Sequence, residues 1–197
     1  TLFFNAPARA KFLGAPAAET RAVSEALIPL ALTHPSVAFT LDSEARSLLD
    51  LPPATDLVER VARLWGEEAG GALIPVGAEE GGISLRGLVH RPDATRPGFR
   101  RAFLFVGGRP FREPVLLKAA DRAYRTTIPE KNRPWLFLFI EAPRGAVDVN
   151  VHPTKAEVRL RERRAVEDLV ERGVRAALEP PASAATFEPR PAPPILK

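Results

Sequence analysis

The sequence predicts an α+β domain in which one β-sheet is covered by helices on one face. Three observations lead to this class. Strand-like segments recur after about residue 37, helical apolar periodicities lie between them, and the two alternate over residues 40–178 in the order β-α-β-β-α-β-β-α. This order is typical of one sheet with helices packed against it.

The predicted strands are of two kinds. Residues 83–90 and 147–151 alternate apolar and polar side chains, which is the period of a half-buried strand. Residues 135–142 are mostly apolar, as in a strand buried on both faces. Further strands are predicted at 37–41 and 101–109, where Gly107-Gly108 is a turn signal, and a short one at "EVRL".

The predicted helices carry apolar stripes and capping signals. A helix begins near Thr20, with Val23, Ala26, Leu27, Leu30 and Ala31 along one stripe and Pro29 inside it. Asp56 and Glu59 have capping-box spacing at the start of a helix over 56–66. Helices are also predicted at 113–125, with Pro114 in the first turn, and at about 163–178.

Composition excludes several classes of protein. The 197 residues include no cysteine, so disulfides and thiolate metal sites are excluded. No apolar run is long enough to span a membrane, and no Gly-rich phosphate loop, nucleophile elbow or His-centred metal site is recognised. The chain contains no methionine, and residues 180–197 are proline-rich like a linker, so we expect a piece of a longer protein.

The positive charge is concentrated in one segment. The whole chain carries a net charge of +4, whereas residues 91–133 contain eleven Lys/Arg against four Asp/Glu, a net of +7. A basic segment on a slightly acidic body suggests a phosphate-rich partner, and a solvated arginine surface is the alternative. The candidate DNA contacts are Arg109 and Arg112, before a helix, and Lys118, Arg122 and Arg125, along one of its faces.

Lys155 is a second candidate. The strand over 147–151 is followed by Pro153, which cannot donate to a ladder, and Lys155 then lies on the loop beyond it. A lysine on a loop is most often solvated, but a loop at the end of a rigid strand can also hold a point charge toward a phosphate.

Three stretches together resemble one family. "LFFNAPARAKFL" near the start, "FVGGRPF" and "VDVNVHPTKAEVRL" are similar to motifs of the MutL family of DNA mismatch-repair proteins, and the resemblance runs from residue 2 to about 178. It implies a ribosomal-protein-S5-domain-2-like fold over residues 37–179, preceded at 1–36 by the remnant of a GHKL ATPase domain with its connecting helix. The linker at 180–197 would lead to a further domain.

The resemblance also implies a function, which is DNA mismatch repair. The lysine of the family's His-Pro-x-Lys loop, here Lys155, would contact the γ-phosphate of ATP in the parent protein. ATP and Mg²⁺ would bind to motifs that lie before "LFFN" in the family. We therefore expect this chain alone neither to bind ATP tightly nor to hydrolyse it, with no catalytic residue and no metal ligand of its own.

The implied partners are DNA, bound without sequence preference, a mismatch-recognition protein of the MutS type, downstream repair enzymes and a second copy of the parent. The implied location is cytoplasmic, at the bacterial nucleoid. Two residues depart from the family's pattern: Pro114 stands where members often have a DNA-binding arginine, and Gly107 replaces a common asparagine.

Two other readings stay open. One is a stand-alone S5-like nucleic-acid-binding module without a nucleotide role. The other is the transducer domain of a gyrase B- or Hsp90-like ATPase. The "LFFN" stretch argues against the first, because a stand-alone module has no need of it.

Overall fold

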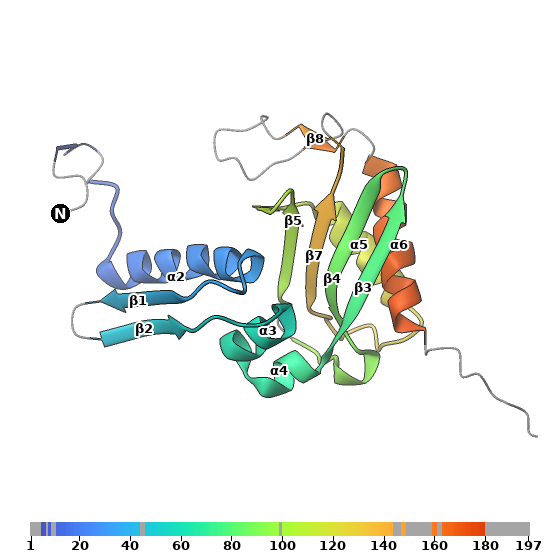
Figure 1. Ribbon diagram of the computed structural model, residues 1–197, viewed down its shortest axis with the longest axis horizontal. Helices are drawn as coiled ribbons and strands as arrows, with labels where there is room; N and C mark the ends of the chain where they lie inside the picture. The colour runs from blue at the N-terminus through green and yellow to red at the C-terminus, as the bar shows by residue number, and fades with distance from the viewer. Residues whose placement is uncertain are drawn as a thin grey trace, which may run out of the picture.

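A five-stranded mixed sheet forms the centre of the molecule, seen in a computed structural model that describes residues 5, 6, 8, 11–43, 46–98, 100–143, 147–148, 159–160 and 163–179 (Figure 1). The strand order is β3-β4-β7-β5-β6, with β5 and β7 parallel and all other neighbours antiparallel. The strands are β3 (Leu73–Glu80), β4 (Ile83–His90), β5 (Ala102–Val106), β6 (Arg109–Phe111) and β7 (Leu136–Glu141).

Two helices, α5 (Pro114–Tyr124) and α6 (Arg163–Leu178), pack side by side on one face of this sheet (Figure 1). Most of their inward residues are small or aliphatic: Leu116, Ala119 and Ala120 from α5 are fully buried, as are Val170 and Val174 from α6, and α5 adds the buried ring of Tyr124. They join Leu85, Leu136 and Leu138 of the sheet in one continuous apolar core. The α+β class with helices on a sheet face, expected from the sequence, is confirmed.

The opposite face of the sheet has a second, aromatic core. Phe105 and Phe137 of the sheet are fully buried there against Val61 of α3 (Leu57–Trp65) and Leu32. Trp65, at the end of α3, lies against Phe103, Phe137 and Trp135, with ring centroids 5.7–5.9 Å apart. The short helix α4 (Glu67–Gly71) follows directly and leads into β3.

A smaller unit extends to one side of the sheet (Figure 1). It consists of α2 (Pro16–Thr33) and a two-stranded antiparallel sheet of β1 (Phe39–Ser43) and β2 (Arg46–Leu51). Only Ala31 and Leu32 of α2 are buried, while Val23 and Leu30 are each 47% exposed. The predicted stripe of α2 is therefore largely uncovered among the described residues, and the helix reaches the core through Ile28 and its last turn.

Most predicted elements occupy their expected places. β4 spans residues 83–90 as expected, α3 is capped by Asp56, and α6 spans 163–178. The 3-10 helix η1 (Pro92–Ala94) and the short pair β8 (Val147–Asp148) and β9 (Arg159–Leu160) complete the described elements. No helix in the described part of the chain is long and apolar enough to cross a membrane.

Four elements were missed, β2, β3, α4 and η1, and the strand predicted over 101–109 is two strands, β5 and β6, which turn back at Gly107-Gly108. β3 contains Pro75 and Gly77, which interrupt the strand signal, and it is recognisable as a strand only by its register with β4. β2 and α4 are short, so their patterns are weak. Pro29 lies inside α2 without ending it, and the Thr33 hydroxyl donates to the carbonyl of Pro29 one turn later.

Candidate nucleic-acid interface

The turn before α5 presents the first two candidate arginines. Gly107 and Gly108 both have positive φ angles, +52° and +71°, and form a two-residue turn of the kind that glycine favours. The turn pairs Val106 with Arg109 and so forms the hairpin of β5 and β6. Arg109 and Arg112 are exposed on this hairpin and just after it.

Arg112 borders a groove between α2 and the β5–β6 hairpin. The groove has a volume of about 580 Å³ and is lined on the α2 side by Glu25, Ile28 and Pro29. Arg100 and Arg101 also line it. Arg112 therefore faces a different part of the surface from the arginines of α5.

The remaining three candidates gather at the C-terminal half of α5. Lys118, Arg122 and Arg125 line one open cavity of about 920 Å³, as the helical spacing predicted. Arg133, which was not among the predicted contacts, lines the same cavity from the loop before β7. Two acidic residues, Asp121 and Glu130, also line it, so the four cations outnumber the acids two to one.

Arg122 is largely neutralised within the fold. Its Nε lies 2.5 Å from Oε2 of Glu171, and Oε1 of Glu171 accepts a second bond from Arg175 at 2.7 Å. The hydrogen bond from Arg122 lowers the pKa of Glu171 and raises the pKa of Arg122, so both stay charged. A phosphate would have to compete with Glu171 for this guanidinium.

Arg100 is also paired, although the sequence did not indicate it. Its two terminal nitrogens bind both carboxylate oxygens of Asp121, at 3.0 and 2.6 Å. This bidentate contact pairs both carboxylate oxygens of Asp121, an acid that lines the same cavity as Lys118 and Arg125. Neither Lys118 nor Arg125 forms an ion pair within the described residues, so these two cations remain available for an anion.

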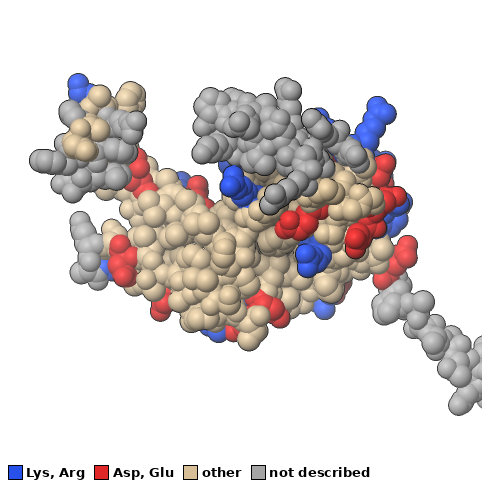
Figure 2. Space-filling view, turned by 45° about the horizontal axis from the view of Figure 1, so that its top comes forward, with Lys and Arg blue, Asp and Glu red and all other residues tan. Residues whose placement is uncertain are grey.

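Charges are interspersed over the face seen in Figure 2. Blue and red residues alternate across it with tan residues between them, and the coloured residues form no continuous basic surface there. The concentration of positive charge in residues 91–133 is therefore divided in space, with one group at the α5 cavity and another at the β5–β6 hairpin.

Several parts of the sequence-based expectation lie outside the described residues. They are Lys155, the expected γ-phosphate contact, residues 149–151 of the predicted strand, residues 2–4 of the "LFFN" stretch and the linker at 180–197. Among the described residues no group of three or more His, Cys, Asp or Glu side chains could hold a metal ion.

Sequence comparison identifies relatives of one kind. The family described as "DNA mismatch repair protein, C-terminal domain" matches residues 61–179. MutL of Gemmatimonas aurantiaca is 42% identical over 177 residues, which cover 90% of this chain and 29% of the relative. MutL of Geobacter sulfurreducens is 38% identical over 199 residues, covering 96% of this chain and 33% of the relative. The chain thus spans about a third or less of these proteins.

Structural comparison agrees. The crystal structure of the ATPase domain of the mismatch repair endonuclease MutL from Aquifex aeolicus is 30% identical, with a TM-score of 0.58, covering 88% of this chain and 59% of that one. The same domain complexed with ADP gives 32% identity and a TM-score of 0.53 over 72% of this chain and 50% of that one. The N-terminal domain of a DNA repair protein, at 21% identity and a TM-score of 0.69, has the same fold, with 90% of this chain and 59% of that one covered. From the family match over more than half of its length, the chain belongs to the MutL family of DNA mismatch repair proteins.

Proposed function

We propose that this chain is the part of a DNA mismatch repair protein that relays ATP binding and hydrolysis by its parent to DNA binding, dimer closure and repair partners. The observation that carries the proposal is the family match over residues 61–179, which covers the whole five-stranded sheet with α5 and α6. The likeness to MutL ATPase domains, one of them complexed with ADP, supports the link to ATP.

The proposed organisation has three parts. Residues 1–36 are the remnant of a GHKL ATPase domain with its connecting helix, residues 37–179 are the S5-like transducer domain, and residues 180–197 are a linker. The packing of α5 and α6 on the five-stranded sheet supports one domain within residues 37–179. The residues that hold ATP and Mg²⁺ are assigned to the parent protein beyond this chain, with Lys155 reaching the γ-phosphate.

The proposed partners follow from family membership. They are a mismatch-recognition protein of the MutS type, downstream repair enzymes and a second copy of the parent. The proposed location is the bacterial cytoplasm, at the nucleoid during repair. Each is assigned to the parent protein.

The proposed DNA contact is the cavity at the C-terminal half of α5. Lys118 and Arg125 provide two charges that are not in an ion pair within the described residues, and Arg133 adds a third, which donates to the backbone carbonyls of Glu130 and Asn132. Arg122 contributes less because Glu171 holds it. Arg109 and Arg112 form a second, separate contact on the hairpin. Such side chains bind phosphates and read charge rather than base sequence.

The test is fluorescence anisotropy of labelled duplexes over a series of salt concentrations. We expect non-specific binding, with a Kd of about 10⁻⁴ to 10⁻⁶ M at physiological salt. The double variant Lys118→Glu, Arg125→Glu should bind all sequences more weakly. It should also flatten the slope of log K against log salt by roughly 1.8, since each lost phosphate contact removes about 0.9.

The matched control reverses the same number of charges elsewhere. Arg21 and Arg46 are exposed on the α2–β1–β2 unit, and the double variant Arg21→Glu, Arg46→Glu changes the net charge equally. If it flattens the slope as much as the cavity variant, DNA senses net charge alone, and the assignment of the cavity is wrong.

A further inference from the structure

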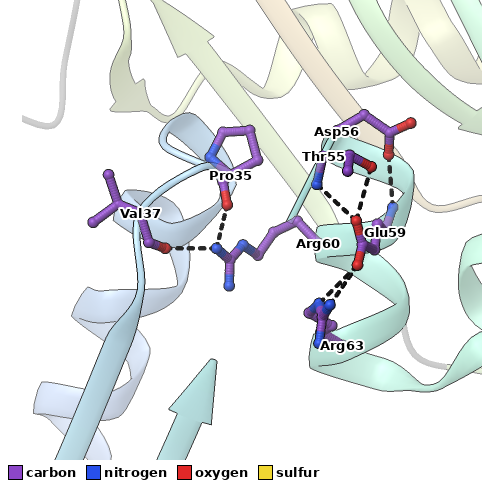
Figure 3. Close-up of polar contacts among 7 residues, drawn as sticks. All are labelled: Pro35, Val37, Thr55, Asp56, Glu59, Arg60 and Arg63. Atoms are coloured by element: carbon purple, nitrogen blue, oxygen red, sulfur yellow. Dashed lines mark hydrogen bonds and ion pairs between the residues drawn. The ribbon is translucent and has the colours of Figure 1, made fainter. Parts of the chain in front are cut away.

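Arg60 is a charged residue in a place where charge is rare. It lies in α3, and its side chain is completely buried, with an exposed fraction of 0%. Its neighbours in the helix behave differently: Glu59 accepts from the backbone and hydroxyl of Thr55, and Arg63 pairs with Glu59 at the helix surface (Figure 3). Arg60 therefore takes no part in the Thr55–Glu59 contacts at the start of α3 or in the Glu59–Arg63 ion pair.

The guanidinium of Arg60 reaches out of α3 to the segment that joins α2 to β1 (Figure 3). Its Nη2 donates to the carbonyl oxygen of Pro35 and to that of Val37, the latter at 2.7 Å. Its Cζ lies 5.8 Å from the centre of the Phe39 ring, at the start of β1. One side chain of α3 thus contacts three residues of the α2–β1 connection.

The charge on Arg60 is balanced by dipoles rather than by an acid. It forms no ion pair with any described residue, and burial lowers its pKa. The two carbonyls directly follow α2, which ends at Thr33, so the guanidinium lies near the negative end of that helix. Nε and Nη1 have no partner in the part of the chain that the structure describes. A swing of α2 would leave a buried cation with no acceptor, which is strongly unfavourable.

The other faces of α3 are fixed to the sheet. Val61 is fully buried in the same apolar cluster as Phe105 and Phe137 of the sheet. Trp65 stacks on Phe103, with centroids 5.9 Å apart, and meets Trp135 edge-on at 5.7 Å. Contacts therefore run without interruption from the α2–β1 connection through Arg60 and α3 to strands β5 and β7.

We infer that Arg60 is a positioning residue that fixes the orientation of the α2–β1–β2 unit on the five-stranded sheet. Its two carbonyl acceptors hold the α2–β1 connection, and α3 transfers that position to the sheet. In the parent protein this contact lets the sheet follow a movement of α2 as one body, a consequence that rests on the proposed relay function.

The test measures the orientation directly, without nucleotide or DNA. The chain has no cysteine, so cysteines introduced at Ala22 on α2 and Ala176 on α6, both exposed, are the only sites for spin labels. Pulsed electron–electron double resonance of the doubly labelled chain measures the distance between the two spin labels, and its distribution should have one narrow peak. Arg60→Met, which keeps the apolar stem and removes the donors, should broaden or split that peak.

Two controls separate positioning from general stability. Arg63→Met removes a guanidinium from the same helix, one that contacts only Glu59, and should leave the peak narrow. A second label pair at Glu79 on β3 and Ala176 on α6 lies within the sheet and helix layers and should stay narrow in every variant. A narrow α2–α6 peak in Arg60→Met overturns the inference. Broadening of the Glu79–Ala176 pair by Arg60→Met also overturns it, because Arg60 would then stabilise the whole fold.

Discussion

The two faces of the five-stranded sheet are packed by different chemistry. On the α5–α6 face the core is made mostly of small and aliphatic residues, with alanines of α5 in fully buried positions and Phe111 and Tyr124 as its aromatic members. On the α3 face the core is built from flat rings, with Phe105 stacked on Phe139 at 4.6 Å and Phe103 on Phe137 at 5.8 Å. Aliphatic side chains interdigitate and fix one packing, whereas stacked rings contact along planes.

The aromatic face also holds cationic and imidazole side chains, whereas the aliphatic core holds the Tyr124 hydroxyl, which donates to the carbonyl of His90. Arg101 lies between Trp65 and Trp135, with its Cζ 4.8 and 5.0 Å from the two ring centres. His90 stacks on the other side of Trp135 at 5.1 Å, and the fully buried Arg60 belongs to the adjoining helix α3. The aliphatic core joins α5 and α6 to the sheet. The α3 face is where the two parts of the chain are joined.

The largest predicted effect comes from Gly87, which lies between the two faces. Gly87 in β4 pairs with Leu138 in β7 and has a φ of +149°, and a Cβ built there would lie 1.9 Å from the carbonyl oxygen of Phe137. Gly87→Ala must therefore separate two central strands. We expect a loss of more than about 4 kcal/mol in the free energy of unfolding, measured by urea denaturation.

The control for Gly87 is Gly71, at the end of α4. A Cβ there meets nothing within 4 Å, and Gly71 does not have a positive φ, so Gly71→Ala should leave stability unchanged or slightly raised. Equal unfolding midpoints for the two variants would show that β4 and β7 can move apart without a loss in the free energy of unfolding. That result would contradict the close pairing of these two strands at Gly87.

Local patterns could predict much of the fold but little of this asymmetry. The alternation in β4, the Asp56 cap and the helical spacing of α5 are visible within a few residues, and the structure agrees with them. A strand such as β3, with Pro75 and Gly77, is defined by its partner β4, whose pairing a local pattern does not contain.

The candidate site was predictable to a similar degree. Helical spacing placed Lys118, Arg122 and Arg125 around one cavity. The partner of Arg122 is Glu171, which lies 49 residues further along the chain, so no local signal indicated that this cation is neutralised. Arg60 was missed for the opposite reason, because an arginine between two other charged residues of an amphipathic helix is typical of a solvated face.

Acid should weaken the aromatic face. Burial, and to a smaller extent the nearby Arg96, lowers the pKa of His90 from its ordinary 6.5 to about 4. The folded state therefore keeps His90 neutral while the unfolded state binds a proton below pH 6.5. Stability is fully present above pH 6.5 and is lost as the pH falls from 6.5 to 4, by on the order of 3 kcal/mol.

The variant His90→Phe isolates this contribution. It keeps a ring against Trp135, and Nδ1 of His90 has no partner among the described residues, so little hydrogen bonding is lost. Urea denaturation between pH 7 and 4 should show a smaller loss in the variant than in the parent chain. An equal loss in both would assign the acid sensitivity to other groups, such as Glu171, whose pKa is lowered by its hydrogen bond from Arg122.

The smallest predicted effect concerns the cation between the two tryptophans. Arg101→Met keeps an apolar stem between Trp65 and Trp135 but removes the planar charge, so one to two cation–π contacts are lost. We expect a loss of about 1–2 kcal/mol in the free energy of unfolding.

Because Trp65 and Trp135 are the chain's only tryptophans, their emission reports the aromatic face alone. Arg101→Met should therefore change the emission of the folded protein while far-ultraviolet circular dichroism stays the same. Arg109→Met, on the exposed hairpin, should change neither signal. If Arg101→Met leaves the emission unchanged, Arg101 does not order the two rings, and the distinction between an aliphatic core and an aromatic core that also holds cations loses its clearest support.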